Sequence, residues 1–223
     1  MSIKKQKDLY SAAGMLAAFS SWTACVQHID VQSIGPKESA VGLATINQFV
    51  HEFTGVHMAL YVITDWLSLV PLGIVMGFAL LGIGQWWKRK HILKVDRSIL
   101  LLGGFYVVLL AAYCYFEKHA VNFRPVLING QLEASYPSST TMLVLCVMST
   151  AMMQFKMRIP NAAIRRCVTI ACFTFTVFMV AGRLLSGVHW FSDVVGGVLL
   201  GTAFVKVYQM CIRISEISAF KNR

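Results

Sequence analysis

Long apolar runs constrain the fold of this chain more than any other feature of its sequence. One of them, residues 56–87, contains Asp65 as its single Asp, Glu, Lys or Arg residue. About 20 apolar residues are enough for a helix to cross the ~30 Å hydrocarbon layer of a bilayer. Because 57% of the 223 residues are hydrophobic and several runs reach that length, the sequence predicts an all-α polytopic membrane protein.

We expect six transmembrane helices in a single membrane domain, residues 1–223. The expected spans are residues 9–26, 66–87, 98–116, 138–155, 167–185 and 189–208. Residues 1–55 should form the first span and a helix at about 45–53 that lies in the membrane interface, and residues 56–223 the helical core. Since run 56–87 is too long for one perpendicular crossing, Asp65 is expected at the outer end of the second span. A cleaved signal peptide is the alternative interpretation of the first run.

The distribution of positive charge predicts the orientation. All but four of the 20 Lys and Arg residues lie in the tails or in the loops on the side of the N-terminus; the four are Lys37, Lys118, Arg124 and Arg183. By the positive-inside rule both termini are cytoplasmic. Topology and anionic inner-leaflet lipid account for the net charge of +10, so nothing indicates a nucleic-acid partner. The six scattered cysteines lack paired ligand spacing, which favours a packing role over a disulfide framework or a zinc site.

Charged residues concentrate between the fifth and sixth expected spans. Charge at the edge of a membrane span is energetically expensive and indicates function. Ser186-Gly187 is a turn signal, after which His189 and Asp193 fall at i and i+4 of a helix, so the carboxylate can reach the imidazole. That contact would prepare the histidine to act as a nucleophile or base, while Arg183 is a cation suited to phosphate. The alternative is a turn with an interfacial histidine and an ordinary ion pair.

Two further connections reach the same membrane face. Lys118 and Arg124 follow the third span, and the hydroxyl residues 138–141 open the fourth. The N-terminus of a helix binds phosphate through free N–H groups, and guanidinium groups add bidentate hydrogen bonds. Taken alone, the cations could be a snorkelling pair and the hydroxyls an N-cap. Their coincidence at one depth predicts a phosphate site at the outer face.

The patterns in these connections resemble the motifs of the type 2 phosphatidic acid phosphatase superfamily, the integral membrane lipid phosphatases related to vanadium haloperoxidases. The family motifs are K-x6-R-P, P-S-G-H and S-R-x5-H-x3-D. The corresponding patterns here are Lys118-x5-Arg124-Pro125, Pro137-Ser138-Ser139-Thr140 and Gly182-Arg183-x5-His189-x3-Asp193. The six-span layout, with motifs after spans three and five and at the start of span four, is also similar to that of the family.

The resemblance implies a role for each matching residue. His189 would be the nucleophile that forms a phosphohistidine, and Asp193 would orient it. The phosphoryl oxygens would be held by residues of all three motifs: Lys118, Arg124, Ser138, the amide of Ser139, Thr140 at the fourth position of the second motif, and Arg183. The family mechanism needs no metal, so we expect no metal ion and no other cofactor.

Each motif departs from the family pattern. One residue is missing between Lys118 and Arg124, Gly182 replaces a serine, and Ser139 replaces a glycine. The largest departure is Thr140, because the family has at that position the histidine that protonates the leaving group. Threonine cannot act as a general acid near neutral pH, and losing such an acid typically lowers the rate 10² to 10⁴-fold.

Two hypotheses follow from Thr140. In the first, the enzyme prefers a lipid diphosphate, such as an undecaprenyl-type carrier, because the departing phosphate is already a tolerable anion. In the second, it acts on monoesters and uses another acid near the outer face. The candidates for that acid are His119, Asp65, Glu133, Glu117 and His57.

The sequence as a whole therefore predicts an integral lipid phosphatase of the cell membrane, with its active site facing outside. Its partners would be the bilayer and a membrane lipid with a phosphate or diphosphate headgroup. Two alternatives remain open. One is a phosphotransferase that passes the phosphoryl group to an alcohol. The other is a chain that has lost hydrolysis and binds or transports a lipid phosphate.

Overall fold

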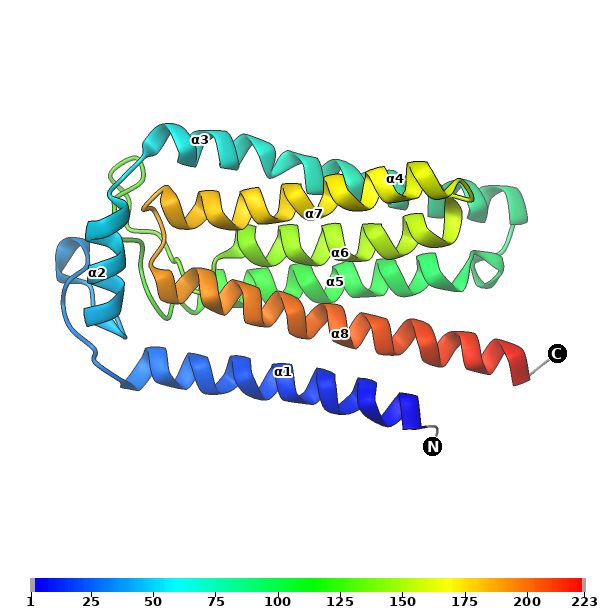
Figure 1. The fold of residues 1–223 in the computed structure, drawn as a ribbon, viewed down its shortest axis with the longest axis horizontal. Helices are drawn as coiled ribbons and strands as arrows, with labels where there is room; N and C mark the ends of the chain where they lie inside the picture. The colour runs from blue at the N-terminus through cyan, green and yellow to red at the C-terminus, as the bar shows by residue number, and fades with distance from the viewer. Residues whose placement is uncertain (1–2, 222–223) are drawn as a thin grey trace.

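A bundle of long helices forms the protein, as the computed structural model shows (Figure 1). The model describes the backbone of residues 3–221 and the side chains of residues 6–215. Its helices are α1 (Ile3–His28), α2 (Ala44–Thr54), α3 (Met58–Leu67), α4 (Leu69–Arg89), α5 (Arg97–Lys118), α6 (Ser139–Arg158), α7 (Ala162–Leu185) and α8 (Phe191–Lys221), with 3-10 turns at Pro36–Glu38 and Ile92–Lys94. Within the described residues, six helical segments are long and apolar enough to cross a membrane, so the predicted all-α, six-span fold is confirmed.

The second span differs from the prediction. Helices α3 and α4 together form one candidate span, Met58–Arg89, which begins eight residues before the expected start at residue 66. Asp65 consequently lies within α3, one turn before the break at Ser68, and not at the outer end of a span. Pro71 explains the break, because proline has no N–H to donate to the carbonyl of Leu67, four residues earlier. The apolar run 56–87 thus forms two helices, α3 and α4, which have different neighbours.

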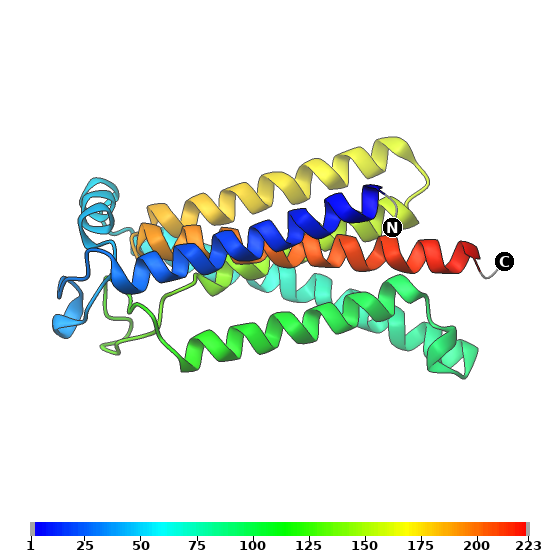
Figure 2. The ribbon, with the colours of Figure 1, turned by 90° about the horizontal axis from the view of Figure 1, so that it is seen from below.

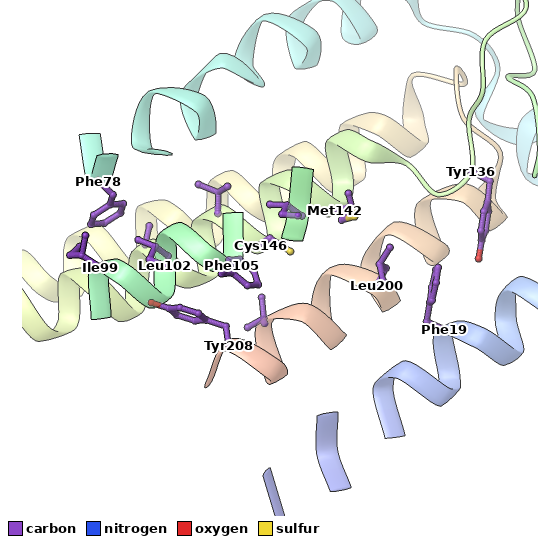
Figure 3. Packing of buried hydrophobic residues seen from close by; sticks show 14 of the residues in the cluster. Phe19, Phe78, Ile99, Leu102, Phe105, Tyr136, Met142, Cys146, Leu200 and Tyr208 are labelled. Atoms are coloured by element: carbon purple, nitrogen blue, oxygen red, sulfur yellow. The ribbon is translucent and has the colours of Figure 1, made fainter. Parts of the chain in front are cut away.

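The interior of the bundle lies along α6 and α8. Figure 3 shows Phe105 of α5 and Tyr208 of α8 packed together near α6, and Phe19 of α1 beside Tyr136 and Leu200. Helix α1 lies along α8 (Figure 1), and the Nε1 of its Trp22 donates to the carbonyl oxygen of Ser192 at 3.1 Å. The apolar N-terminal segment is therefore part of the helical packing and supports the start of α8.

A glycine of α8 allows close approach of α6. A Cβ atom at Gly197 would come within 2.7 Å of the carbonyl oxygen of Ser138, a distance that real Cβ contacts do not show. The beginning of α6 therefore rests directly on the backbone of α8. The N–H of Ser138 also donates to the carbonyl oxygen of Asp193 at 2.9 Å. Two of the predicted motifs are thus joined at the level of the backbone.

One end of the bundle carries the connections that hold the candidate site. Helix α2 lies across this end (Figures 1 and 2) and exposes the apolar side chains of Ile46, Phe49 and Phe53. A helix was expected at residues 45–53, and its exposed apolar face suits the surface of a membrane. Helix α1 begins and α8 ends at the opposite end of the bundle (Figure 1), as an even number of crossings requires.

Candidate active site

The connection between α5 and α6 places Arg124 against His189. Within it, isolated antiparallel β-bridges pair Phe123 with Ala134 and Ile128 with Gln131. The indole N–H of Trp190 donates to the carbonyl oxygen of Phe123 at 2.8 Å, which ties the neighbour of His189 to the neighbour of Arg124. As a result, the Nη1 of Arg124 lies 3.3 Å from the Nε2 of His189. Residues 65 positions apart in the chain thus form one charged site.

His189 does not lie on a helical face as the i, i+4 spacing predicts. Helix α8 begins at Phe191, two residues later, because the carboxylate of Asp193 accepts the N–H of Trp190 at 2.9 Å and caps the helix. The Nδ1 of His189 is 3.9 Å from the Oδ2 of Asp193, which is longer than a hydrogen bond. The carboxylate therefore faces the imidazole, but it is primarily bonded to other groups.

The surroundings of His189 favour its neutral form. The residue is 4% exposed, and burial lowers the pKa of its imidazole to about 4, with the cations of Arg124 and Arg183 acting in the same direction and Asp193 opposing them. Because a guanidinium only donates hydrogen bonds, the Nε2 that faces Arg124 must be the accepting nitrogen, and Nδ1 then carries the proton toward Asp193. Near neutral pH, Nε2 presents a lone pair to the side of the site that holds Arg124.

Asp193 is held by a buried polar network that the sequence analysis missed. The hydroxyl of Ser135 donates to its Oδ2, and the Nδ2 of Asn122 donates to its Oδ1 at 3.2 Å. Asn47 extends the network from α2, since its side chain donates to the Oγ of Ser192 and accepts the N–H of Ser192, both at 2.9 Å. Asn122 lies between Lys118 and Arg124 in the first motif, which could have drawn attention to it. Nothing in the sequence separates Asn47 from the other polar residues of 27–55.

Replacing Asn47 with alanine should destabilise the protein. The substitution would leave the buried N–H of Ser192 without its partner, and an unsatisfied buried donor costs about 1–3 kcal/mol. We expect a lower thermal unfolding midpoint in detergent, whereas Gln48→Ala, on the exposed side of the same helix, should leave the midpoint almost unchanged. If Asn47→Ala and Gln48→Ala unfold at the same temperature, the bond from Asn47 to Ser192 does not stabilise the site.

Arg183 is the second cation of the site. Its side chain is almost fully buried, its Nη2 lies 3.1 Å from the Oδ1 of Asp65, and its Nε and Nη1 have no hydrogen-bond partner among the described residues. Its Cζ lies 5.1 Å from the ring centre of Tyr61, and the Cζ of Arg124 lies 5.9 Å from the same centre. Tyr61 thus contacts both guanidinium groups. Buried donors without partners are rare, so Arg183 has N–H groups that an anion could satisfy.

A cavity of about 660 Å³ opens beside the two arginines. Its polar end is formed by Arg124, Arg183, Asp65, Ser139 and Thr140, which brings the predicted phosphate ligands of all three motifs to one place. The remaining wall consists mainly of apolar side chains from α4, α5 and α6: Leu72, Val75, Val107, Leu109, Leu110, Met142 and Leu143. A second, apolar cavity of about 380 Å³ lies between α4 and α5 and has Val75 and Tyr106 in common with the first. The polar end therefore lies next to mainly apolar walls.

The other predicted residues are placed differently. Ser138 is buried, and its hydroxyl accepts a hydrogen bond from Thr141 at 3.0 Å. Lys118 is exposed at the end of α5 and does not line the cavity with the two arginines. Lys118 and Ser138 are thus the predicted phosphate ligands that do not line the cavity.

Three of the five candidate acids, His119, Glu133 and Asp65, have different surroundings. The ring of His119 is exposed and stacks on Tyr115, with 4.6 Å between the ring centres. Glu133 lies beside Arg124, with 3.0 Å between its Oε2 and the Nε of the arginine. Asp65 lines the cavity itself. Over the described residues, no three His, Cys, Asp or Glu side chains are grouped as metal ligands would be.

Fold and site together define a membrane-embedded helical bundle with a buried neutral histidine and two arginines at one end. Residues 111–215 match the family model described as the PAP2 superfamily. This stretch contains both arginines, the start of α6, His189 and Asp193. The similarity to the PAP2 superfamily therefore covers the part of the chain that carries the candidate site.

A solved structure extends the likeness to the rest of the bundle. The crystal structure of the first transmembrane PAP2 type phosphatidylglycerolphosphate phosphatase from Bacillus subtilis is similar with a TM-score of 0.55 and 18% sequence identity. The similarity covers 90% of this chain and 94% of that chain, so the two share a fold. No curated protein sequence matches the chain.

Proposed function

We propose that this protein is an integral membrane lipid phosphatase whose His189 accepts the phosphoryl group of its substrate. The observation that carries the proposal is the neutral imidazole whose Nε2 faces Arg124 at 3.3 Å. A phosphate group drawn to Arg124 and to the unpartnered N–H groups of Arg183 would present its phosphorus to that nitrogen. The superfamily match and the name of the structurally similar phosphatase support the same activity.

The reaction would proceed in two displacements. In the first, the lone pair of Nε2 forms a bond to phosphorus while the bond to the leaving oxygen breaks. Arg124 and Arg183 stabilise the charge on the transferred group, because such transition states depend mainly on positioning and electrostatics. Asp193 faces the protonated Nδ1 and stabilises the positive charge that the ring acquires. In the second displacement, water attacks the phosphohistidine and releases phosphate.

A lipid is the substrate class that fits the cavity. The polar end would hold the phosphate, and the apolar walls of α4, α5 and α6 would contact the hydrocarbon chain. The second cavity, between α4 and α5, offers further apolar surface to a long chain. The distribution of Lys and Arg supports cytoplasmic termini in the cell membrane and a site at the outer face.

A lipid diphosphate is the preferred substrate in this proposal. Thr140 lines the polar end of the cavity, and its hydroxyl cannot protonate a leaving alkoxide. A departing phosphate needs that proton less than an alkoxide does. The preference should therefore reflect the leaving group and not the length of the hydrocarbon chain.

An activity panel tests this function. Purified protein in mixed micelles is given a polyprenyl diphosphate, a phosphatidylglycerolphosphate and a phosphatidic acid, and free phosphate is measured with His189→Ala as background. We expect phosphate release, with the highest kcat/KM for the diphosphate. Equal or reversed values would remove the preference, and no release from any lipid would contradict the phosphatase. Transfer to added glycerol in place of release would identify a phosphotransferase.

A further inference from the structure

We propose that Asp65 is the proton donor to the leaving oxygen, the task that Thr140 cannot perform. This inference rests on the proposed function, in which His189 takes the phosphoryl group. It concerns the lipid monophosphate, whose leaving alkoxide needs a proton, whereas the departing phosphate of the preferred diphosphate does not. Asp65 lies in α3, outside residues 111–215 and outside all three sequence motifs. The following contacts bring it to the reacting groups.

Packing between α3 and α7 places Asp65 in the site. Gly182 has no side chain, and a Cβ atom there would come within 2.7 Å of the Cγ2 of Thr64. Helix α3 can therefore lie directly on α7 at this level. Tyr61 and Asp65, one turn apart on α3, both reach Arg183, the first through its ring and the second through its carboxylate. Glycine in place of the serine of the third motif thus permits the approach that brings in the carboxylate.

The position of Asp65 within the cavity suits a leaving-group acid. The cavity is lined by Asp65 together with Arg124, Arg183, Ser139 and Thr140, and Asp65 is the one carboxylate among the described residues that line it. Beyond this polar end the walls are mainly apolar. In a bound lipid phosphate, the oxygen that leaves lies between the phosphorus and the hydrocarbon. It would consequently lie between the arginines and the apolar walls, next to Asp65.

The present partner of Asp65 indicates how the carboxylate would be released. Its Oδ1 lies 3.1 Å from the Nη2 of Arg183, and phosphate is the ligand proposed for the same guanidinium. A phosphate group that binds Arg183 would take over this contact. Asp65 would then face the substrate, and its carboxylate would take the proton of a lipid phosphate that binds as the monoanion. Glu133 cannot substitute for it, because Glu133 pairs with Arg124 and does not line the cavity.

Every proton and electron pair in the two displacements has a donor and an acceptor. As the bond from Nε2 to phosphorus forms, the electron pair of the breaking P–O bond goes to the leaving oxygen, which takes the proton of Asp65 and departs as an alcohol. Asp65 is left as a carboxylate. Water then attacks phosphorus, the electron pair of the N–P bond returns to Nε2, and Asp65 takes the proton of the water. The proton on Asp65 leaves with the product, so the products are the alcohol and dihydrogen phosphate, and the side chains return to their starting states.

The test compares leaving groups in the Asp65→Asn variant. Asparagine keeps the shape of the side chain but has no acidic proton. We expect kcat for a lipid monophosphate to fall by about 10² or more, the usual contribution of a general acid. On a lipid diphosphate kcat should fall by less than about tenfold. The matched control is Asp96→Asn, which removes a carboxylate paired with Arg89 and Arg158 on the other side of the bundle and should affect both substrates little.

A second variant separates proton transfer from a structural role. Adding Thr140→His to Asp65→Asn restores an acid at the position where the family has one, and should recover at least tenfold of the lost monophosphate activity. Equal losses on both substrates, or no loss on either, would overturn the role of Asp65. Failure of the Thr140→His addition to restore activity in a folded protein would also count against it. If the wild-type protein releases phosphate from no lipid, the proposed function itself fails.

Discussion

Replacing His189 with alanine should reduce kcat for lipid phosphate hydrolysis by at least ~10⁴-fold. The imidazole is the group that forms the bond to phosphorus, and loss of a nucleophile of this kind has effects of that order or larger in other enzymes. The ring is buried between Arg124 and Asp193. Arg124 is not a nucleophile, and both carboxylate oxygens of Asp193 already accept hydrogen bonds from other groups, so neither neighbour should replace the ring. The measurement is phosphate release per protein molecule in detergent micelles, at substrate concentrations far above KM.

The matched control for this change is His119→Ala. His119 is also a histidine at the same end of the bundle, but its ring is exposed and stacks on Tyr115. We expect its kcat to stay within about threefold of the wild-type value. Both variants should unfold near the wild-type temperature. A His189→Ala protein that is folded and retains more than a tenth of the activity would contradict the nucleophilic role.

Replacing Arg124 with lysine should be the next most damaging substitution, with a loss of about 10²–10³ in kcat. Lysine keeps the charge but lacks the planar fork that can donate to two phosphoryl oxygens at once. In other phosphoryl-transfer enzymes, a single arginine at the transition state is worth 10³–10⁵ in kcat, so a partial loss is expected when the charge is retained. KM should change less than kcat, because the contact matters most as charge develops.

Arg158→Lys provides the comparison for Arg124→Lys. Arg158 is a partly buried arginine near the far end of α6, where its Nη2 lies 3.7 Å from the Oδ2 of Asp96. The same substitution there should leave kcat nearly unchanged. If the two variants have similar activity, or if Arg124→Lys alters KM alone, Arg124 binds substrate without acting on the transition state.

Much of the fold follows from the apolar runs. Helices α5, α6 and α7 begin and end within a few residues of the expected spans, apart from the start of α7, because a membrane helix must hold its own hydrogen bonds and must be long enough to cross. The second span was placed incorrectly, since hydropathy alone does not show that one apolar run divides at Ser68 into two helices. The start of α8 was wrong by two residues because the cap by Asp193 takes precedence over the i, i+4 pattern.

The site was predictable only where its residues carry a local signal. Arg124, Arg183, His189 and Asp193 are polar residues next to apolar runs, and their spacing indicates a phosphate site. Other members have no such signal. Tyr61, in the middle of an apolar helix, contacts both arginines with its ring. Asn47 bonds to Ser192, 145 positions away in the chain, and supports Asp193 through it. Contacts of this kind depend on how helices pack, which a single sequence does not reveal.

For the same reason, the sequence could name Asp65 as a candidate acid but could not show that it lies beside Arg183. As a carboxylate within an apolar run, it was one of several candidates for the missing acid. Its selection depends on Gly182, which lets α3 approach α7, and on the ion pair with Arg183. The departures from the family motifs at Gly182 and Thr140 are thereby connected through one helix contact.

Transfer of a labelled phosphoryl group to the protein tests the central role of His189 most directly. A lipid phosphate labelled in its terminal phosphoryl group is mixed with the protein, the reaction is stopped within milliseconds in alkali, and the labelled residue is identified by mass spectrometry of the peptides. We expect label on the His189 ring. The label should appear faster than phosphate is released, and it should be absent in His189→Ala. Label on another residue, or steady hydrolysis without any labelled protein even when release is slowed by cooling, would contradict the nucleophilic role of His189.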